Sequence, residues 1–394
     1  MILLERGAVD RLPAHVARPA LVVVDANTEA VAGARVARQL GAEMLRLPAD
    51  AHATEETAEQ VRSRLRGGLV AVGSGTLTDV VRYAADRAGA DFVSVPTAAS
   101  MDGYASSVAA LERDGVKLTV PARAPVAIFA DPEIAAGAPR ELTRAGIGDL
   151  LAKATARVDW LAAHLLYGEA WQELPPPGEP DVEALLAGDV EAVASLLGAL
   201  IASGQAMAEV GSSRPASGCE HHASHVWDLL ALRGARPRSL HGLQVGYATV
   251  FAMRLQQFAF GGGVAVPRRP QPVAEPLDAD ARAWLGEPPP AVLEAVAEKQ
   301  RLIAAVPDSW PDDPRRWAAV RARLAASLTR FDAVADALRR AGIPDRAAGY
   351  LGIDAAMLRA GLRYGARLRS RYTVVDFLEG QGALDEALDR ALCL

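Results

Sequence analysis

Four of the seven histidines in this 394-residue chain fall within 21 residues, at positions 221, 222, 225 and 241. His221 and His225 are four residues apart, so a helix would place both on one face and turn His222 away by about 100°. Asp149 adds a carboxylate at the start of the first long helical pattern. Two imidazoles and one carboxylate without a thiolate suit Zn²⁺, Ni²⁺ or Fe²⁺ and leave a coordination position open for substrate. We therefore expect a catalytic divalent metal site, with His222 structural or facing solvent.

A glycine-rich turn offers a second kind of chemistry. Gly73, Ser74, Gly75 and Thr76 follow the apolar residues 69–72, and a helical pattern begins with Leu77. Glycines let a backbone approach a phosphate closely, and a helix N-terminus attracts an anion. The alternative is that this Gly-Ser-Gly turn is only a tight connection between strand and helix. The segment also lacks the spacing G-x-G-x-x-G of the common dinucleotide fingerprint.

Two further segments carry polar groups at strand ends. Asp25 ends the first predicted strand, where its carboxylate would contact an adenosine ribose and favour NAD over NADP; the alternative is a solvated turn residue. Residues 94–106 follow another predicted strand and bring hydroxyl groups and a carboxylate into one irregular loop, with Thr97, Ser100, Asp102 and Ser106 as its candidate ligand contacts. The alternative for this loop is helix N-capping.

Short apolar runs alternate with helical patterns over the first 145 residues, which predicts a parallel α/β sheet. The expected strands are residues 20–24, 43–47, 69–72, 92–95 and 126–130, with a hairpin over 109–120 centred on Arg113, Asp114 and Gly115. After Gly148 the apolar residues recur with a period near 3.6 and β-branched runs almost vanish, so the second half is expected to be all helical. We predict an α/β nucleotide-binding domain over residues 1–145 and a helical domain over 146–394.

Composition excludes several classes of protein. Hydrophobic residues make up 51% and charged residues 23%, which indicates a folded globular chain. The formal charge of -6 and the lack of a basic run argue against a nucleic-acid partner. Only Cys219 and Cys393 occur, the N-terminus lacks a signal-like segment, and the apolar stretches are too short or interrupted to span a bilayer. We expect a cytoplasmic enzyme without a membrane partner.

These motifs together resemble sn-glycerol-1-phosphate dehydrogenases, a branch of the iron-containing alcohol dehydrogenase and dehydroquinate synthase superfamily. The resemblance rests on six segments: residues 73–79, 94–106, Gly148-Asp149 with Lys153, 217–225 with Trp227, 241–246 and 369–373. Residues 260–320, rich in proline and tryptophan, match nothing in that pattern.

The resemblance implies a fold and a set of roles. An N-terminal dinucleotide-binding domain would precede an all-helical domain, as in dehydroquinate synthase. Asp149, His221 and His241 would hold one Zn or Ni ion, with Fe less favoured, and Asp102 and His225 would contact substrate. The residues implied for the NAD or NADP pyrophosphate are Gly73, Ser74, Gly75, Thr76 and Leu77, with Thr97, Ser100 and Ser106 on the ribose and nicotinamide side.

The implied reaction interconverts sn-glycerol 1-phosphate and dihydroxyacetone phosphate in phospholipid biosynthesis, by a homodimer or larger assembly. His225 would carry the proton. Lys153 would orient Asp149 or lie on the helix surface. With 39 of the 42 basic residues being arginine, no cation stands out as the phosphate ligand. The alternatives are a sugar-phosphate cyclase, a dehydrogenase for another polyol or alcohol, and a catalytically silent nucleotide-binding regulator.

Overall fold

The computed structural model describes residues 1–113, 115–176 and 178–393. The chain forms two compact units: the first comprises Met1–Leu150 and Gly178–Ser212, and the second comprises Leu151–Pro177 and Ser213–Leu394. A segment beyond residue 177 therefore returns to the first unit, an arrangement that the predicted division at residue 145 does not contain. That division into domains stays a prediction.

The first unit is built on a six-stranded parallel sheet with the order β1-β8-β5-β4-β2-β3. Its strands are β1 (Ile2–Leu4), β2 (Ala20–Asp25), β3 (Glu43–Leu47), β4 (Gly68–Gly73), β5 (Phe92–Pro96) and β8 (Ala127–Ala130). The five predicted strands are confirmed within one residue at each end. The edge strand β1 was missed because three residues are too few to show a pattern, and its pairing with β8 aligns Ile2 with Ile128, far along the chain.

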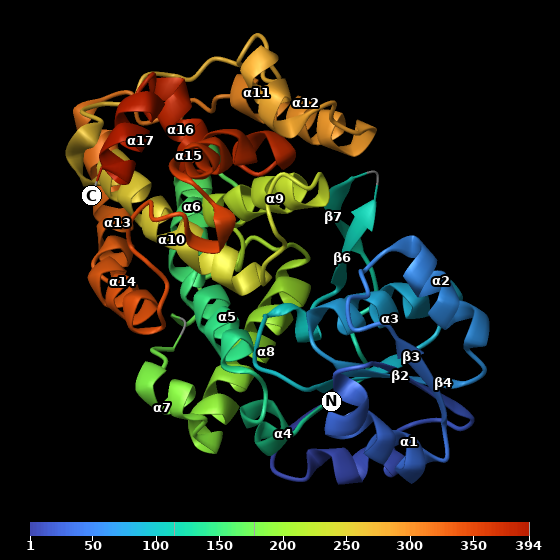
Figure 1. Ribbon diagram of the computed structural model, residues 1–394. Coiled ribbons are helices and arrows are strands. Elements are labelled where there is room, and N and C mark those ends of the chain that lie inside the picture. The colour runs from blue at the N-terminus through green and yellow to red at the C-terminus, as the bar shows by residue number, and fades with distance from the viewer. Residues whose placement is uncertain (114, 177, 394) are drawn as a thin grey trace. The chain divides into compact units, whose positions relative to one another are not determined.

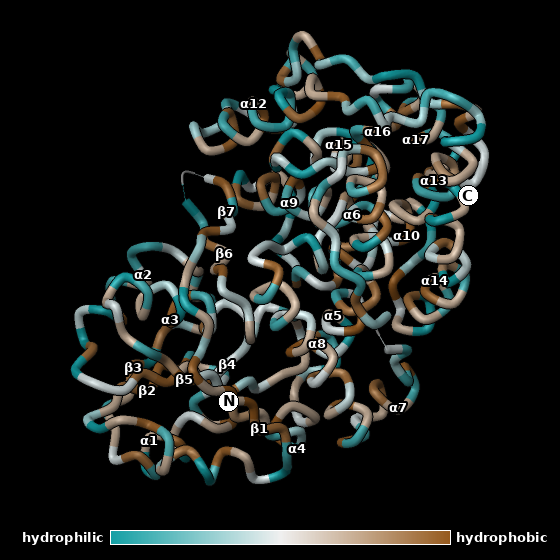
Figure 2. Tube along the Cα trace, turned by 180° about the vertical axis from the view of Figure 1, so that it is seen from behind, coloured by the Kyte–Doolittle hydropathy of each residue, from teal (hydrophilic) through white to brown (hydrophobic). Residues whose placement is uncertain are grey.

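Helices cover both faces of this sheet (Figure 1). On one face, α2 (Glu55–Arg64) and α3 (Gly75–Ala88) pack on Leu21, Val23 and Leu69. On the other face, α1 (Ala34–Leu40) with the short helices η1 (Ala8–Ala14) and η2 (Glu29–Gly33) packs on Val22, Val24 and Val70. Alternate residues of one strand thus enter two cores, which explains the continuous apolar runs that Figure 2 colours brown.

A hairpin and a loop complete the α/β part. Strands β6 (Val108–Arg113) and β7 (Val116–Pro121) pair antiparallel, which confirms the predicted hairpin, although Asp114 at its centre lies outside the described residues. The short helix η3 (Gly103–Ala105) precedes the hairpin.

Four further helices belong to the first unit: α4 (Pro132–Ala136), α5 (Arg140–Leu151), α7 (Val182–Ala187) and α8 (Val190–Val210). Over the described residues, α8 is the one helix long and apolar enough to cross a membrane by length and composition. Its buried side chains Leu197, Leu200 and Ile201 lie at helical spacing, and α8 packs on η3 and α4. Burial of 39% of its apolar window shows that packing accounts for part of the hydrophobicity of α8.

All the regular secondary structure in the described part of the second unit is helical, as predicted. Its elements are α6 (Lys153–Tyr167), α9 (Cys219–Leu232), α10 (His241–Phe258), η4 (Ala259–Gly263), α11 (Ala279–Leu285), α12 (Pro290–Ala304), α13 (Pro314–Leu328), α14 (Phe331–Arg340), η5 (Tyr350–Gly352), α15 (Ala355–Tyr364), η6 (Gly365–Leu368), α16 (Val374–Gln381) and α17 (Leu384–Leu392).

The proline-rich region 260–320 contributes to the core of the second unit. Trp310 and Trp317 are fully buried, and their indole N–H groups donate to the carbonyls of Pro267 and Val264. Trp310 lies in the loop before α13 and is nevertheless buried, because a large indole with a satisfied N–H gains more from burial than from exposure.

Candidate active site

The turn between β4 and α3 is closely packed, and its role toward a phosphate stays a prediction. A Cβ on Gly73 would lie 2.2 Å from Cδ1 of Leu77, so any larger residue there would force the Leu77 side chain to move. Within the described residues, the side chain of the N-cap residue Ser74 makes no capping hydrogen bond to α3. The first turn of a 14-residue helix therefore keeps backbone N–H groups for an anion.

Asp25 acts as a turn residue in the structure. Its Oδ1 accepts hydrogen bonds of 2.8 Å from the backbone N–H groups of Asn27 and Thr28, and its own N–H donates to Oγ1 of Thr28. The carboxylate sits at the carboxyl end of β2, which pairs in parallel with β4, so it lies at the same sheet edge as Gly73. Its contact with a ribose stays a prediction.

The hydroxyl groups of the loop after β5 hold the loop itself in shape. The Thr97 N–H donates to the Gly73 carbonyl at 3.3 Å, which ties the loop to the glycine-rich turn. The Ser100 hydroxyl hydrogen-bonds Tyr104 Oη, and Oγ of Ser106 accepts from the Val108 N–H at 3.0 Å. The roles of these side chains toward a cofactor stay predictions.

Arg82 on α3 anchors this loop through hydrogen bonds to its backbone. Its fully buried guanidinium donates to the carbonyls of Gly103, Tyr104 and Val108 and pairs with Asp79. One side chain thus fixes both η3 and the start of β6 relative to the helix that begins at the glycine-rich turn. The anchoring role of Arg82 could not be predicted from local sequence patterns, because its contacts reach residues more than 20 positions along the chain.

Asp102 and Asp149, two predicted site residues, meet directly. The N–H of Asp102 donates to Oδ2 of Asp149 at 2.9 Å, and the hydroxyl of Ser203 donates to Oδ2 of Asp102 at 3.1 Å. Two glycines allow this approach: a Cβ on Gly146 would lie 1.9 Å from the Ala99 carbonyl oxygen, and one on Gly204 2.5 Å from that of Asp102. In the described structure Asp102 makes no side-chain cap on η3, so the capping alternative is wrong for this residue.

The histidines gather within the second unit at the facing ends of α9 and α10. The ring centroids of His221 and His241 are 5.2 Å apart, and those of His225 and His241 are 6.3 Å apart. The hydroxyl of Ser224 lies 3.4 Å from Nδ1 of His241. The predicted shared face of His221 and His225 is thus directed at the first residue of α10.

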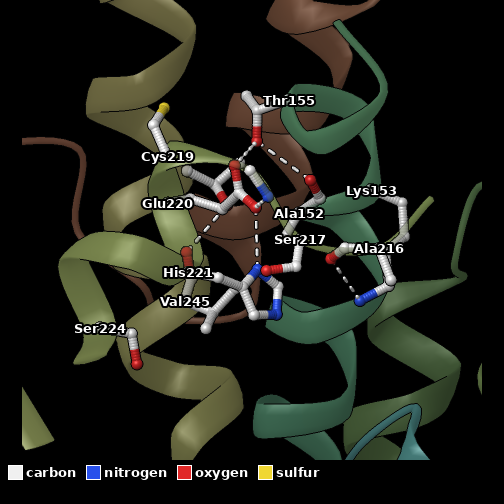
Figure 3. Close-up of polar contacts among 12 residues, drawn as sticks. Ala152, Lys153, Thr155, Ala216, Ser217, Cys219, Glu220, His221, Ser224 and Val245 are labelled. Carbon is white, nitrogen blue, oxygen red and sulfur yellow. Dashed lines mark hydrogen bonds and ion pairs between the residues drawn. The ribbon is translucent and has the colours of Figure 1, made fainter. Parts of the chain in front are cut away.

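Glu220 orients His221, as Figure 3 shows. Its buried carboxylate contacts Nδ1 of His221 at 2.8 Å and accepts from the Gly218 N–H and from the Thr155 hydroxyl. A proton on Nδ1 directs the lone pair of Nε2 away from Glu220, the arrangement that metal-binding imidazoles use. Burial raises the pKa of Glu220, while hydrogen bonds from the backbone N–H groups of Gly218 and Glu220 lower it.

A second carboxylate, Asp159, supports the start of α9. It accepts from the N–H groups of Cys219 and Val374 and from the Gln256 amide. Burial, and next the charge of Glu220, raises the pKa of Asp159 to about 6. Asp159, Cys219 and Glu220 place their donor atoms within 4.8 Å of one another, but these hydrogen bonds already use the carboxylate oxygens. We therefore assign this cluster a structural role, which is to hold the start of α9 in place.

The metal ligands implied by the resemblance are divided between the units. His221 and His241 belong to the second unit, and Asp149, fully buried at the end of α5, belongs to the first. The histidine pair fits a divalent ion, because two imidazoles lie together and a carboxylate orients one of them. The complete set of three stays a prediction.

For two neighbouring residues the structure excludes one of the predicted alternatives. Lys153 is only 1% exposed and donates to the Ala216 carbonyl, so it is not a helix-surface lysine. His222 does not face solvent but is buried against η6, where a Cβ on Gly365 would lie 2.5 Å from its backbone. Burial, with the charge of Arg371, holds the pKa of His222 well below its usual value.

Known proteins are similar to this chain in sequence and in fold. The sequence model for iron-containing alcohol dehydrogenases matches residues 4–139. The glycerol-1-phosphate dehydrogenase (NAD(P)+) of Pyrococcus furiosus is 41% identical over 250 residues, which are 59% of this chain and 70% of that protein. The enzyme of the same name from Bacillus licheniformis is 31% identical over 411 aligned positions, 98% of this chain and 90% of that protein. The chain belongs to the glycerol-1-phosphate dehydrogenase family.

Solved structures agree with this fold. A probable glycerol dehydrogenase from Sinorhizobium meliloti superposes with a TM-score of 0.63 at 18% identity, covering 99% of this chain and 96% of that chain. An iron-containing alcohol dehydrogenase from Thermococcus thioreducens gives 0.62 at 16% identity, covering 99% and 97%. The predicted α/β sheet followed by a helical region is confirmed for this member of the glycerol-1-phosphate dehydrogenase family.

Proposed function

We propose that this chain is a metal-dependent, NAD(P)-linked dehydrogenase that interconverts sn-glycerol 1-phosphate and dihydroxyacetone phosphate. The relatives at 31% to 41% identity carry the name glycerol-1-phosphate dehydrogenase (NAD(P)+), which favours this reaction over the cyclase alternative. The observation that carries the proposal in the structure is the His221–His241 pair, with Glu220 holding His221 through its Nδ1.

Asp149, His221 and His241 would hold one divalent ion, which we propose is Zn or Ni. When bound, such an ion polarises the oxygen on C2 of the substrate and stabilises its negative charge. Glu220 keeps Nε2 of His221 available for the ion, and the Asp102 N–H orients Oδ2 of Asp149. Each of these positioning contacts is made within one unit.

The cofactor would lie along the carboxyl edge of the sheet. The uncapped first turn of α3, residues Gly73–Leu77, would receive the pyrophosphate, and the loop with Thr97, Ser100 and Ser106 would follow the nicotinamide ribose. Asp25 would face the adenosine ribose, where its charge disfavours a 2′-phosphate, so we propose a preference for NAD.

His225 is the candidate for proton transfer. It lies one helical turn from His221, 6.3 Å from the ring of His241 and 9% exposed, so it borders both the histidine pair and solvent. An imidazole there can exchange the proton of the C2 hydroxyl with water near neutral pH. Asp102 would accept a hydrogen bond from a substrate hydroxyl, since Ser203 holds its carboxylate in place.

The purified protein, reconstituted with Ni²⁺ or Zn²⁺, tests the proposal. Dihydroxyacetone phosphate should cause steady oxidation of NADH with one product molecule formed for each NADH consumed. A cyclase regenerates its cofactor and would show no net oxidation, and a nucleotide-binding regulator would show no turnover. We further propose that the enzyme is a cytoplasmic homodimer or larger assembly and that it supplies phospholipid biosynthesis. Size-exclusion chromatography with light scattering tests the oligomeric state.

A further inference from the structure

Arg371, in the second unit, has only neutral hydrogen-bond partners among the described residues. Its Nη1 donates to Oγ of Ser213 and to the Ser217 carbonyl, and its Nη2 donates to Oγ of Ser217. All three acceptors are neutral. Among the described residues, no Asp or Glu lies within ion-pair distance of this guanidinium, although the residue is only partly exposed.

Three other cations of this region form ion pairs. Arg214 forms a two-pronged pair with Glu169, Arg367 pairs with Glu379, and Lys299 pairs with Asp376. Burial lowers the pKa of Arg371 to about 9, and the charges of Arg214 and Arg369 act in the same direction. A guanidinium still carries its charge at neutral pH under these conditions, so Arg371 brings a positive charge that no ion pair among the described residues neutralises.

The hydrogen bonds of Arg371 leave one edge of its guanidinium available for a ligand. A guanidinium has five N–H groups, and the three hydrogen bonds to Ser213 and Ser217 use three of them. Over the part of the chain that the structure describes, Nε and the second hydrogen of Nη2 have no acceptor. Two parallel N–H groups on one edge match two oxygens of a phosphate.

The position of Arg371 relates it to the proposed metal site. Ser217, which holds the guanidinium, lies four residues before His221, and both are drawn in Figure 3. Glu220, which orients His221, is also one of the carboxylates whose charge acts on Arg371. In glycerol 1-phosphate the phosphorus is three bonds from C2, so an anion site this near the histidines suits the substrate.

We propose that Arg371, held by Ser213 and Ser217, binds the phosphate group of the substrate and selects phosphorylated over unphosphorylated three-carbon ketones. This inference rests on the proposed function for its physiological ligand. The proposal thereby names one of the many arginines as the phosphate ligand, for which no single cation stood out in the sequence.

The test compares two ketones that differ only in the phosphate, dihydroxyacetone phosphate and dihydroxyacetone, on the metal-reconstituted full chain with NADH. For Arg371→Gln we expect the KM for dihydroxyacetone phosphate to rise about 10- to 100-fold, the loss of a charged hydrogen-bonded contact. For dihydroxyacetone, kcat/KM should stay within about twofold. Arg371→Lys should recover part of the loss, since it restores the charge without the two-pronged geometry.

The matched control is Arg363→Gln, which removes a charge that is paired with Asp385 in the same unit. It should leave both substrates unaffected. An unchanged KM for dihydroxyacetone phosphate in Arg371→Gln, or an equal loss on both ketones, would overturn the proposal.

Calorimetric titration with inorganic phosphate separates this inference from the proposed function. The wild-type chain should bind phosphate, and Arg371→Gln should lose that binding while its thermal melting shows a folded protein. If no polyol phosphate is turned over but phosphate binding still depends on Arg371, the anion site stands and the proposed reaction fails. If the wild type binds no phosphate, or if the variant binds it equally well, the anion site fails. Should Arg371→Gln not fold, the same titration on Arg371→Lys decides, with weakened binding expected.

Discussion

The backbone N–H of Asp102 donates a hydrogen bond of 2.9 Å to the carboxylate of Asp149. This contact joins the loop after β5, the proposed substrate side, to the helix that carries a proposed metal ligand. Gly146 and Gly204 make it possible by removing the side chains that would separate α5 and α8 from the loop. The first unit therefore holds the proposed cofactor loop and the proposed metal carboxylate in one hydrogen-bonded structure.

Asp149→Asn should abolish metal binding. The substitution keeps the size of the side chain but removes its charge, and affinity for a divalent ion should fall by on the order of 100-fold or more. Elemental analysis after dialysis measures the bound ion, and circular dichroism checks that the fold survives. Asp336→Asn, at an exposed surface pair with Arg340, is the matched control and should keep its metal. Full metal content in Asp149→Asn would remove Asp149 from the ligand set.

His225→Gln should slow turnover while the ion remains bound. Losing a proton-transfer group costs about 10² to 10⁴ in kcat, and the wild-type dependence of kcat on a group near neutral pH should disappear. Metal content and the pH profile of kcat are the measurements. If the ion is lost instead, His225 is a ligand, and its role exchanges with that of His221.

Glu220→Gln should weaken metal binding through His221. The neutral amide no longer favours a proton on Nδ1, so affinity should fall about 10- to 100-fold. Competition with a chelator measures this affinity without any reference to activity. Thr155→Val removes only the hydroxyl that donates to Glu220 and should cause a smaller loss. Equal affinity in Glu220→Gln and wild type would show that Glu220 has no positioning role.

Arg82→Met should loosen the loop after β5. It leaves Asp79 without its partner and three carbonyls without their donor, and the unfolding free energy should drop by about 3–5 kcal/mol. Urea denaturation followed by circular dichroism measures the change. The control is Arg87→Met on the same helix, where the side chain is exposed and a change below about 0.5 kcal/mol is expected. A similar small change in Arg82→Met would contradict the anchoring role.

Burial of Asp159 predicts a pH dependence of stability. Its pKa rises from 3.8 to about 6 on folding, so the native protein binds this proton more tightly than the unfolded chain. The stabilisation from that proton is complete below the unfolded pKa and is lost as pH rises through about 6. Thermal midpoints of wild type and Asp159→Asn, measured across this range, should show a downward slope for the wild type that is reduced in the variant. Parallel slopes would contradict this assignment.

Local patterns made much of the fold predictable. Five strands and the hairpin follow from short apolar runs and turn residues, and the histidine pair follows from spacing along one helix and the start of the next. Contacts between distant segments were not predictable in the same way. The Thr155 hydroxyl meets Glu220 across 65 residues, and Arg82 reaches Tyr104 in η3 across 22 residues. The helix surface was likewise one of the two alternatives for Lys153, because nothing in its own segment reveals its hydrogen bond to the Ala216 carbonyl.

The most direct test of the whole account is the oxidation of NADH by the metal-stripped and metal-reconstituted protein with dihydroxyacetone phosphate. We predict turnover that requires Ni²⁺ or Zn²⁺, that forms glycerol 1-phosphate in step with NADH consumed, and that is absent in His241→Ala. Undiminished turnover by the stripped protein or by His241→Ala would contradict a reaction centred on these histidines.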